Sequence, residues 1–288
     1  MRLITGICLL SLLLSCSGTK KKESGERIIT VTMEPQRYFA EAIAGDKFSI
    51  KSMVPKGTSP ETYDPVPQQL VSLGESEAYL KIGYIGFEVT WMNRLLENAP
   101  HLKVFDLSKG IALIHEAGHS HGDHYHPGGV EPHVWNSTIN AKIIAKNILD
   151  ALCALDMDNK EYYQQRHDVL VNRIEQTDSI ILGLLKDDAD HAFMIYHPAL
   201  SYFARDYGLL QICIEEGGKE PSPAHLKELI GICKQESVRI IFIQPEFDQR
   251  NAEVIARETG TEVVLINPLS YDWDEEMIHI AKSLSYGK

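Results

Sequence analysis

Short apolar stretches alternate along the chain with segments in which apolar residues recur every three or four positions. The first pattern is typical of buried strands and the second of amphipathic helices. Such an alternation predicts an α/β fold in which mostly parallel sheets are flanked by helices. We expect strands at 27–33, 48–54, 78–82, 102–106, 192–196, 209–214, 239–244 and 262–266, and helices at 35–45, 66–74, 87–98, after 136–137, at 159–186, 200–207, from 223 and at 251–259.

The helix expected at 159–186 is the longest uninterrupted one. It contains no proline, and its only glycine, Gly183, lies near its end. At about 1.5 Å per residue it would measure roughly 42 Å, which is more than one small lobe needs. The chain therefore predicts two α/β lobes joined by one long helix, with a ligand cleft between them. The expected parts are a leader at 1–16, a tether at 17–27, a first lobe at 28–158, the linking helix at 159–187 and a second lobe at 188–288.

The N-terminal segment has the features of a bacterial lipoprotein signal. Arg2 precedes a mainly apolar run from Leu3 to Leu14, which is too short to span a membrane permanently. A small residue, Ser15, stands directly before Cys16, the expected site of lipidation. The alternative is an ordinary secretory signal that happens to contain this cysteine. The polar stretch that follows, 17–27, is expected to be a flexible tether.

Charge and cysteine content narrow the class of protein. The net charge of −12 argues against a nucleic-acid partner and is compatible with a protein that handles cations. Outside the leader only Cys153, Cys213 and Cys233 remain, and no Cys-x-x-Cys pair is present. A thiolate metal site and a disulfide-stapled fold are therefore not expected, and we interpret the three as buried apolar residues.

Candidate ligands follow predicted strands in both lobes. The loop after 48–54 holds Glu61, and the long loop after 102–106 ends at His133. His197 directly follows 192–196, and Asn267 directly follows the last strand. Ligands of open α/β sheets bind beyond the carboxyl ends of the strands, so these four side chains could hold a divalent ion between the lobes.

A histidine-rich segment, HEAGHSHGDHYH, interrupts the regular pattern. Because glycines are scattered through it, we expect a mobile loop over 115–130 that captures metal as an accessory to the main site. The alternative is a solvated loop that binds metal only at unphysiological concentration. The five histidines are His115, His119, His121, His124 and His126.

Six blocks of sequence resemble the zinc- and manganese-binding solute-binding lipoproteins of bacterial ABC importers, in the same order and with similar spacing. The resemblance covers nearly the whole chain after the leader and implies two lobes, one long helix and a metal between the lobes. The blocks are VPKGTSPETYDPVPQQL, EPHVWNSTINAKIIAKNI, YHPALSYFARDYGL, EGGKEPSPAHL, IIFIQPEFDQRNAEVIARETG and VVLINPLSYDW.

The four metal ligands of that family match this chain unevenly. His133 and His197 stand at positions where the family has ligating histidines. Glu61 stands where the family usually has a histidine, and Asn267 stands where it usually has an aspartate. The carboxylate of the set has moved from the second lobe to the first, so we expect a competent site completed by Asn267 or water. A weakened or repurposed site is the alternative.

The resemblance implies an extracytoplasmic binding protein that captures a divalent metal and delivers it to an ABC permease in the inner membrane. Zinc is the expected metal, with manganese or iron as alternatives, because two histidines and a carboxylate also suit harder ions. We expect a monomer that is periplasmic or on the cell surface and anchored through Cys16. A metal-dependent hydrolase is a rival, although the chain lacks a His-Glu-x-x-His helix. A surface adhesin with a weakened site is another.

Overall fold

The computed structural model describes residues 26–115, 119–121, 124–126, 129–186, 191–215 and 217–285. The predicted leader and most of the predicted tether lie outside these residues. Within them, none of the helices combines the length and the apolar character that crossing a membrane requires.

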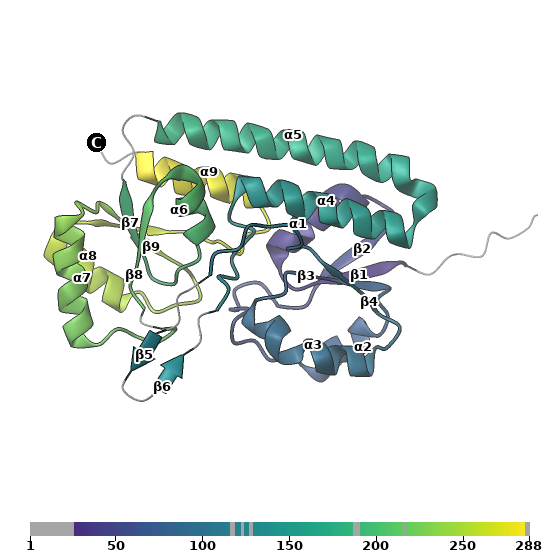
Figure 1. Cartoon of the computed structure of the whole chain (residues 1–288), viewed down its shortest axis with the longest axis horizontal. Helices are drawn as coiled ribbons and strands as arrows, with labels where there is room; N and C mark the ends of the chain where they lie inside the picture. The colour runs from purple at the N-terminus through teal and green to yellow at the C-terminus, as the bar shows by residue number, and fades with distance from the viewer. Residues whose placement is uncertain are drawn as a thin grey trace, which may run out of the picture.

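Two parallel four-stranded sheets form the two lobes (Figure 1), as predicted. Their strand orders are β2-β1-β3-β4 and β8-β7-β9-β10, so the two lobes share one topology. In each sheet the second strand lies on one side of the first strand and the third strand lies on the other side. This reversal of strand order leaves a crevice at the carboxyl ends of the strands. The strands are β1 (Ile28–Val31), β2 (Ser49–Ser52), β3 (Ala78–Lys81), β4 (Lys103–Asp106), β7 (Ala192–Ile195), β8 (Leu210–Cys213), β9 (Ile240–Ile243) and β10 (Glu262–Leu265).

Helices cover both faces of each sheet because the central strands β1, β3, β7 and β9 are buried on both sides, as parallel strands usually are. One face of each sheet contributes to a core that runs through both lobes, and the opposite faces form two smaller cores. The shared core takes side chains from α1 (Glu34–Ala44), α4 (Thr138–Leu155), α6 (Ser201–Tyr207) and α9 (Trp273–Ser285), and the outer cores take them from α2 (Pro67–Leu73), α3 (Gly86–Asn98), α7 (Pro223–Gln235) and α8 (Arg250–Thr259).

The long helix α5 (Lys160–Leu185) follows a short 3-10 turn, Met157–Asn159, and runs along one side of both lobes (Figure 1). It packs against α1 and α4 of the first lobe and against α9 of the second. Its buried residues include Tyr163, Leu170 and Ile174, which recur at helical spacing. The helix predicted at 159–186 is therefore present, one residue shorter at each end.

Two tryptophans tie the lobes together close to the predicted ligands. The indole N–H of Trp135 donates to the carbonyl oxygen of Pro268 at 2.8 Å, and that of Trp273 donates to the carbonyl oxygen of Trp135 at 2.8 Å. Both rings are fully buried in the shared core. The segments that carry His133 and Asn267 are consequently fixed against one another.

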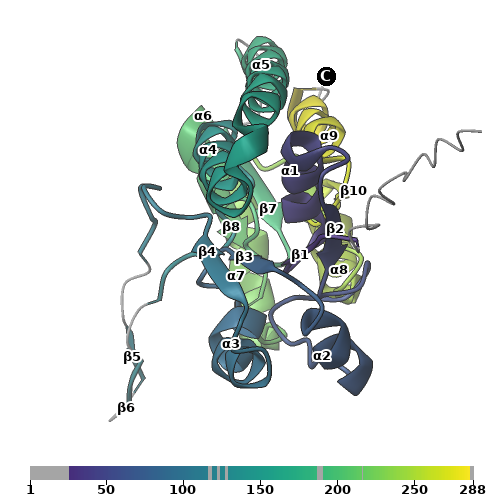
Figure 2. The same cartoon turned by 90° about the vertical axis from the view of Figure 1, so that its right-hand side faces the viewer.

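Besides the short 3-10 turn, two elements were not predicted. The first is α9, and the second is a hairpin of β5 (His119–His121) and β6 (His124–His126), which lies away from both sheets (Figure 2). The predicted cap of α4 is confirmed, because the Ser137 hydroxyl accepts the N–H of Asn140. Of the three cysteines predicted to be buried, only Cys233 is; Cys153 and Cys213 are partly exposed, and Cys153 lies at the edge of the shared core.

Candidate metal centre

Three of the four predicted ligands converge between the lobes. Glu61, His133 and His197 each offer a ligand atom, and these atoms all lie within 4.8 Å of one another. Glu61 comes from the loop after β2, His133 from the long segment between β4 and α4, and His197 from the end of β7. The sheet edges therefore bring together residues that are far apart in sequence.

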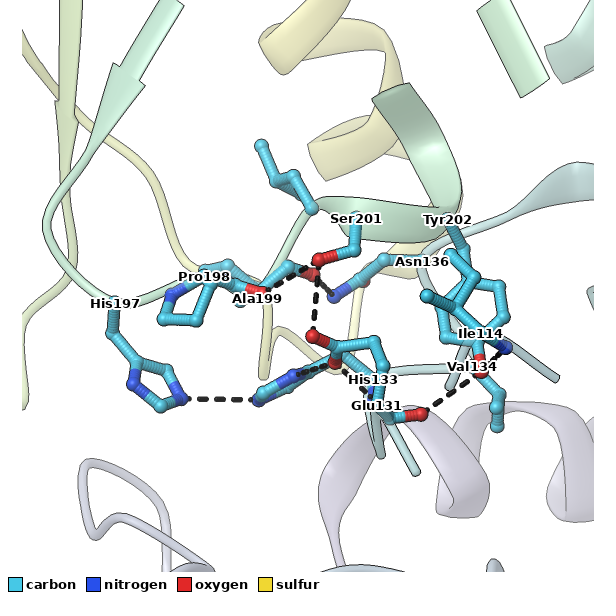
Figure 3. Close-up of polar contacts among 12 residues, drawn as sticks. Ile114, Glu131, His133, Val134, Asn136, His197, Pro198, Ala199, Ser201 and Tyr202 are labelled. Atoms are coloured by element: carbon cyan, nitrogen blue, oxygen red, sulfur yellow. Dashed lines mark hydrogen bonds and ion pairs between the residues drawn. The ribbon is translucent and has the colours of Figure 1, made fainter. Parts of the chain in front are cut away.

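The two imidazole rings face each other through their Nε2 atoms, which are 3.2 Å apart (Figure 3). On the opposite side of each ring, Nδ1 lies against a carboxylate: Glu131 for His133, and Glu215 for His197 at 2.9 Å. A carboxylate accepts the Nδ1 proton, so in the neutral rings both Nε2 atoms carry lone pairs. Two lone pairs so close together repel unless a metal ion or a proton lies between them. Two nitrogens about 2.0–2.1 Å from one tetrahedral zinc ion would be about 3.3–3.4 Å apart.

Glu131 holds His133 rigidly in place. Its carboxylate also accepts the His133 backbone N–H at 3.0 Å and the Ser201 hydroxyl at 3.0 Å, and its carbonyl oxygen accepts the Tyr202 hydroxyl at 2.9 Å (Figure 3). Burial disfavours the charged form of His133, but the hydrogen bond and charge of Glu131 outweigh it and raise the pKa of His133 above 6.5. The same pair lowers the pKa of Glu131, against the effect of its burial.

His197 is held by its backbone and by stacking. The buried side chain of Gln244 donates to the His197 carbonyl oxygen at 2.7 Å and accepts its N–H at 3.3 Å. The Phe247 ring stacks on the imidazole, with centroids 4.8 Å apart and planes tilted by 20°. The ring can therefore turn little away from His133.

Glu61 reaches the site from the first lobe. One carboxylate oxygen, Oε2, accepts the backbone N–H of Gly86 at 3.0 Å. The other oxygen, Oε1, is buried and has no hydrogen-bond partner among the residues that the structure describes. A buried acceptor of this kind is costly unless it binds a cation or a proton.

The space between these groups has the size of an ion. The cavity that they line measures about 20 Å³, little more than the volume that one water molecule needs. Pockets for organic ligands are usually ten or more times larger. Its lining includes Ser59, Pro60, Glu61, His133, Trp135, His197, Ala199, Gln244, Glu246, Phe247, Pro268 and Leu269.

Asn267 lies in the turn after β10, beside this cavity. Its carboxamide oxygen accepts the N–H of Leu269 at 3.2 Å, and its backbone N–H donates to Glu276 at 2.7 Å. The residue lines an adjacent pocket together with Lys56 and Tyr271. The carboxamide oxygen of Asn267 is thus hydrogen-bonded within its own turn, and the role of this residue as a metal ligand stays a prediction.

The histidine-rich segment has a regular backbone in part. His119 pairs with His126 and His121 with His124 in the antiparallel hairpin, and His115 forms an isolated bridge with Val130. The hairpin lies away from both sheets (Figure 2). Metal capture by these histidines stays a prediction as well.

Sequence reasoning overlooked the residues that hold the ligands. Glu131 could have been found, because an acidic residue two positions before His133 is within reach of its ring. Glu215 and Gly86 gave no such signal. Glu215 is 18 positions from His197 and meets it because β8 lies beside β7. Gly86 is 25 positions from Glu61.

The fold and the site define a class of protein: two α/β lobes that enclose an ion-sized site of two imidazoles and a carboxylate. Residues 29–285 match the family model described as zinc-uptake complex component A, periplasmic. The chain belongs to this family, whose members are solute-binding proteins of ABC importers and not enzymes.

Two curated relatives illustrate the similarity. The zinc-binding lipoprotein AdcA of Streptococcus pneumoniae strain R6 is 27% identical over 284 residues, which cover 95% of this chain and 56% of AdcA. The high-affinity zinc uptake system protein ZnuA of Bacillus subtilis is 27% identical over 264 residues, which cover 88% of this chain and 82% of that protein. The chain thus spans little more than half of AdcA and most of the Bacillus protein.

Solved structures agree with the fold. A crystal structure of ZnuA superposes with a TM-score of 0.83 at 34% identity, over 90% of this chain and 98% of the other. A ZnuA variant that lacks its residues 138–173 and is described as zinc-bound gives the same TM-score and identity, over 91% and 98%.

Proposed function

We propose that this protein is the solute-binding component of an ABC importer, that it captures a divalent metal ion, and that it delivers the ion to a membrane permease. Zinc is the proposed ion, held by Glu61, His133 and His197, with Asn267 or water in the fourth position. The names of AdcA and of the Bacillus protein support zinc, while other relatives are named for manganese and iron.

One observation carries the proposal. The two Nε2 atoms lie 3.2 Å apart, each on a ring whose other nitrogen is bonded to a carboxylate. This arrangement fixes the tautomer that ligates a metal and presents both lone pairs to the same point. The unpartnered Oε1 of Glu61 adds a third, negatively charged donor.

The proposal also covers the location of the protein, its anchor, the histidine-rich segment and its oligomeric state. Relatives are named lipoproteins, which supports an extracytoplasmic location, periplasmic or on the cell surface, and an anchor at Cys16. The histidines at 115–126 would capture metal as an accessory to the main site without forming part of it. The protein would act as a monomer.

The rival functions find less support. A hydrolase with two histidines and one glutamate would need room for its substrate, whereas the cavity measures about 20 Å³. An adhesin role is compatible with metal binding, and one neighbour at 22% identity is described as a laminin-binding adhesin. That likeness shows the fold alone.

Calorimetric titration of metal-free protein with Zn²⁺, Mn²⁺ and Fe²⁺ tests the proposal. We expect binding of one ion at the main site, with a dissociation constant well below about 1 μM for zinc, because three charged or preoriented donors meet at one small cavity. The absence of submicromolar binding by all three ions would overturn the transport function.

Replacement of Glu131 by glutamine is expected to weaken zinc binding by roughly 10- to 100-fold, because the His133 ring loses the charge that makes Nε2 a better donor. The Ser201 hydroxyl can still bond the glutamine, so the fold should persist. Glu258→Gln, an exposed change on α8, is the matched control. Competition against a chromophoric chelator measures both, and equal affinities for the two variants would contradict the assigned role.

A further inference from the structure

The Glu61 loop is attached to the first turn of α3, a helix of 13 residues. The N–H of Gly86 donates to Oε2 of Glu61 at 3.0 Å, and the N–H of Phe87 donates to the carbonyl oxygen of Pro60 at 2.9 Å. The first N–H groups of a helix lack partners within it and favour negative charge. The helix therefore holds one side of the carboxylate by hydrogen bonding and by its dipole.

Only glycine permits this approach. A Cβ atom on Gly86 would lie 2.8 Å from Oε2 of Glu61 and still closer to the Glu61 carbonyl oxygen. The residue is not among the glycines with positive φ, so close packing and not backbone freedom explains its identity. Gly183 and Gly231, both within helices, have nothing within 4 Å of such an atom.

The hydrogen bond from Gly86 gives the two carboxylate oxygens of Glu61 different roles. Oε2 is occupied by the helix N-terminus, and the buried Oε1, which lacks a partner among the described residues, remains for a metal. A carboxylate fixed in this way binds an ion through one oxygen. With His133 and His197 it supplies three donors, and the cavity of about 20 Å³ leaves room for an ion and little solvent.

We infer that Gly86 is a specificity-determining residue: by fixing Glu61 as a one-oxygen ligand, it favours four-coordinate Zn²⁺ over ions that need more donors. Zinc accepts four ligands readily, whereas Mn²⁺ prefers about six and oxygen-rich surroundings. A released Glu61 could bind through both oxygens and admit the larger coordination sphere. Gly86 is thus a positioning residue that acts through Glu61, and the inference rests on the proposed metal-binding function.

The test compares Gly86→Ala with wild type and with Gly231→Ala as the matched control. Zn²⁺ and Mn²⁺ affinities are measured separately by competition titration. Since Gly86 acts on a ligand from outside the coordination sphere, we expect Gly86→Ala to weaken zinc binding by roughly 10- to 100-fold. Manganese binding should weaken less or improve, so that the zinc-to-manganese preference falls at least about 10-fold. Gly231→Ala should leave both affinities within about twofold.

A double-mutant cycle separates positioning from general damage. In a Glu61→Ala background, Gly86→Ala should change zinc affinity by less than about twofold, because no carboxylate remains to be positioned. An unchanged zinc-to-manganese preference in the single variant would overturn the inference, and so would an undiminished effect of Gly86→Ala in the Glu61→Ala background. Failure of the wild-type protein to bind either ion would instead overturn the proposed function.

X-ray absorption of the wild-type zinc complex keeps the inference testable even if Gly86→Ala does not fold. We expect four nitrogen or oxygen ligands at about 2.0–2.1 Å. Five or more ligands, with two oxygens at carboxylate-chelate distances, would show that Glu61 binds through both oxygens and would overturn the inference.

Discussion

Alanine at His133 or His197 is expected to lower zinc affinity by at least about 100-fold, more than the loss of an outer partner such as Glu131 costs. Each substitution removes one of two Nε2 donors that lie 3.2 Å apart and point to the same position. The remaining imidazole and Glu61 would form a two-donor site. Competition with a chelator of known affinity, followed by calorimetry for the weak variants, measures the change.

His101→Ala is the matched control, since His101 is an exposed histidine in the same lobe as His133. It should bind zinc within about twofold of wild type. Circular dichroism checks that each variant remains folded, because His133 is buried. If alanine at either candidate left affinity within threefold of wild type, that histidine would not be a ligand.

Acidification should release the metal over a range that begins above pH 6.5. The pKa of His133 is raised above this ordinary value because Glu131 outweighs the effect of burial, with Glu61 and Glu215 adding to it. Below the raised pKa the metal-free protein carries a proton on His133, and an incoming ion must displace it. Metal affinity therefore falls as the pH falls, by up to about 10-fold per pH unit for each displaced proton.

Between pH 7 and pH 5 the expected loss for the proton displaced from His133 is up to about 100-fold. The pKa of Glu131 is lowered below 4.5, so this carboxylate stays ionised throughout the window. Zinc titrations at several pH values, in buffers of different ionisation enthalpy, measure both affinity and proton release. A flat profile without proton release would contradict histidine ligation.

The carboxylates behind the ligands change the charge of the site. Counting ligands alone, a dication with Glu61 leaves one positive charge. Glu131 and Glu215 lie directly behind the two rings, and including them turns the total to one negative charge. Each of these carboxylates accepts the Nδ1–H of its ring, and this hydrogen bond makes Nε2 a stronger donor to the ion. The site therefore suits a cation more strongly than its ligand set alone suggests.

Of the two elements that the sequence analysis missed, one had a clear signal in the sequence. The first turn of α9 contains Asp274, Glu275 and Glu276, and acidic residues there favour a helix start. Its buried residues Met277, Ile280, Ala281 and Leu284 follow helical spacing. Its existence was available from sequence. The hairpin of β5 and β6 was harder, because glycine and histidine have no strong preference for strands.

The alternation of apolar segments determined the two parallel sheets and the long helix, because strands buried on both faces and helices buried on one leave different periodic patterns. It also placed Glu61, His133 and His197 in segments that follow strands. Only the tertiary structure decided which of these groups meet and how each is held. Glu215 reaches His197 across neighbouring strands, and Gly86 receives Glu61 because its missing side chain leaves room. Contacts of this kind depend on distances through space, which local sequence periodicity does not encode.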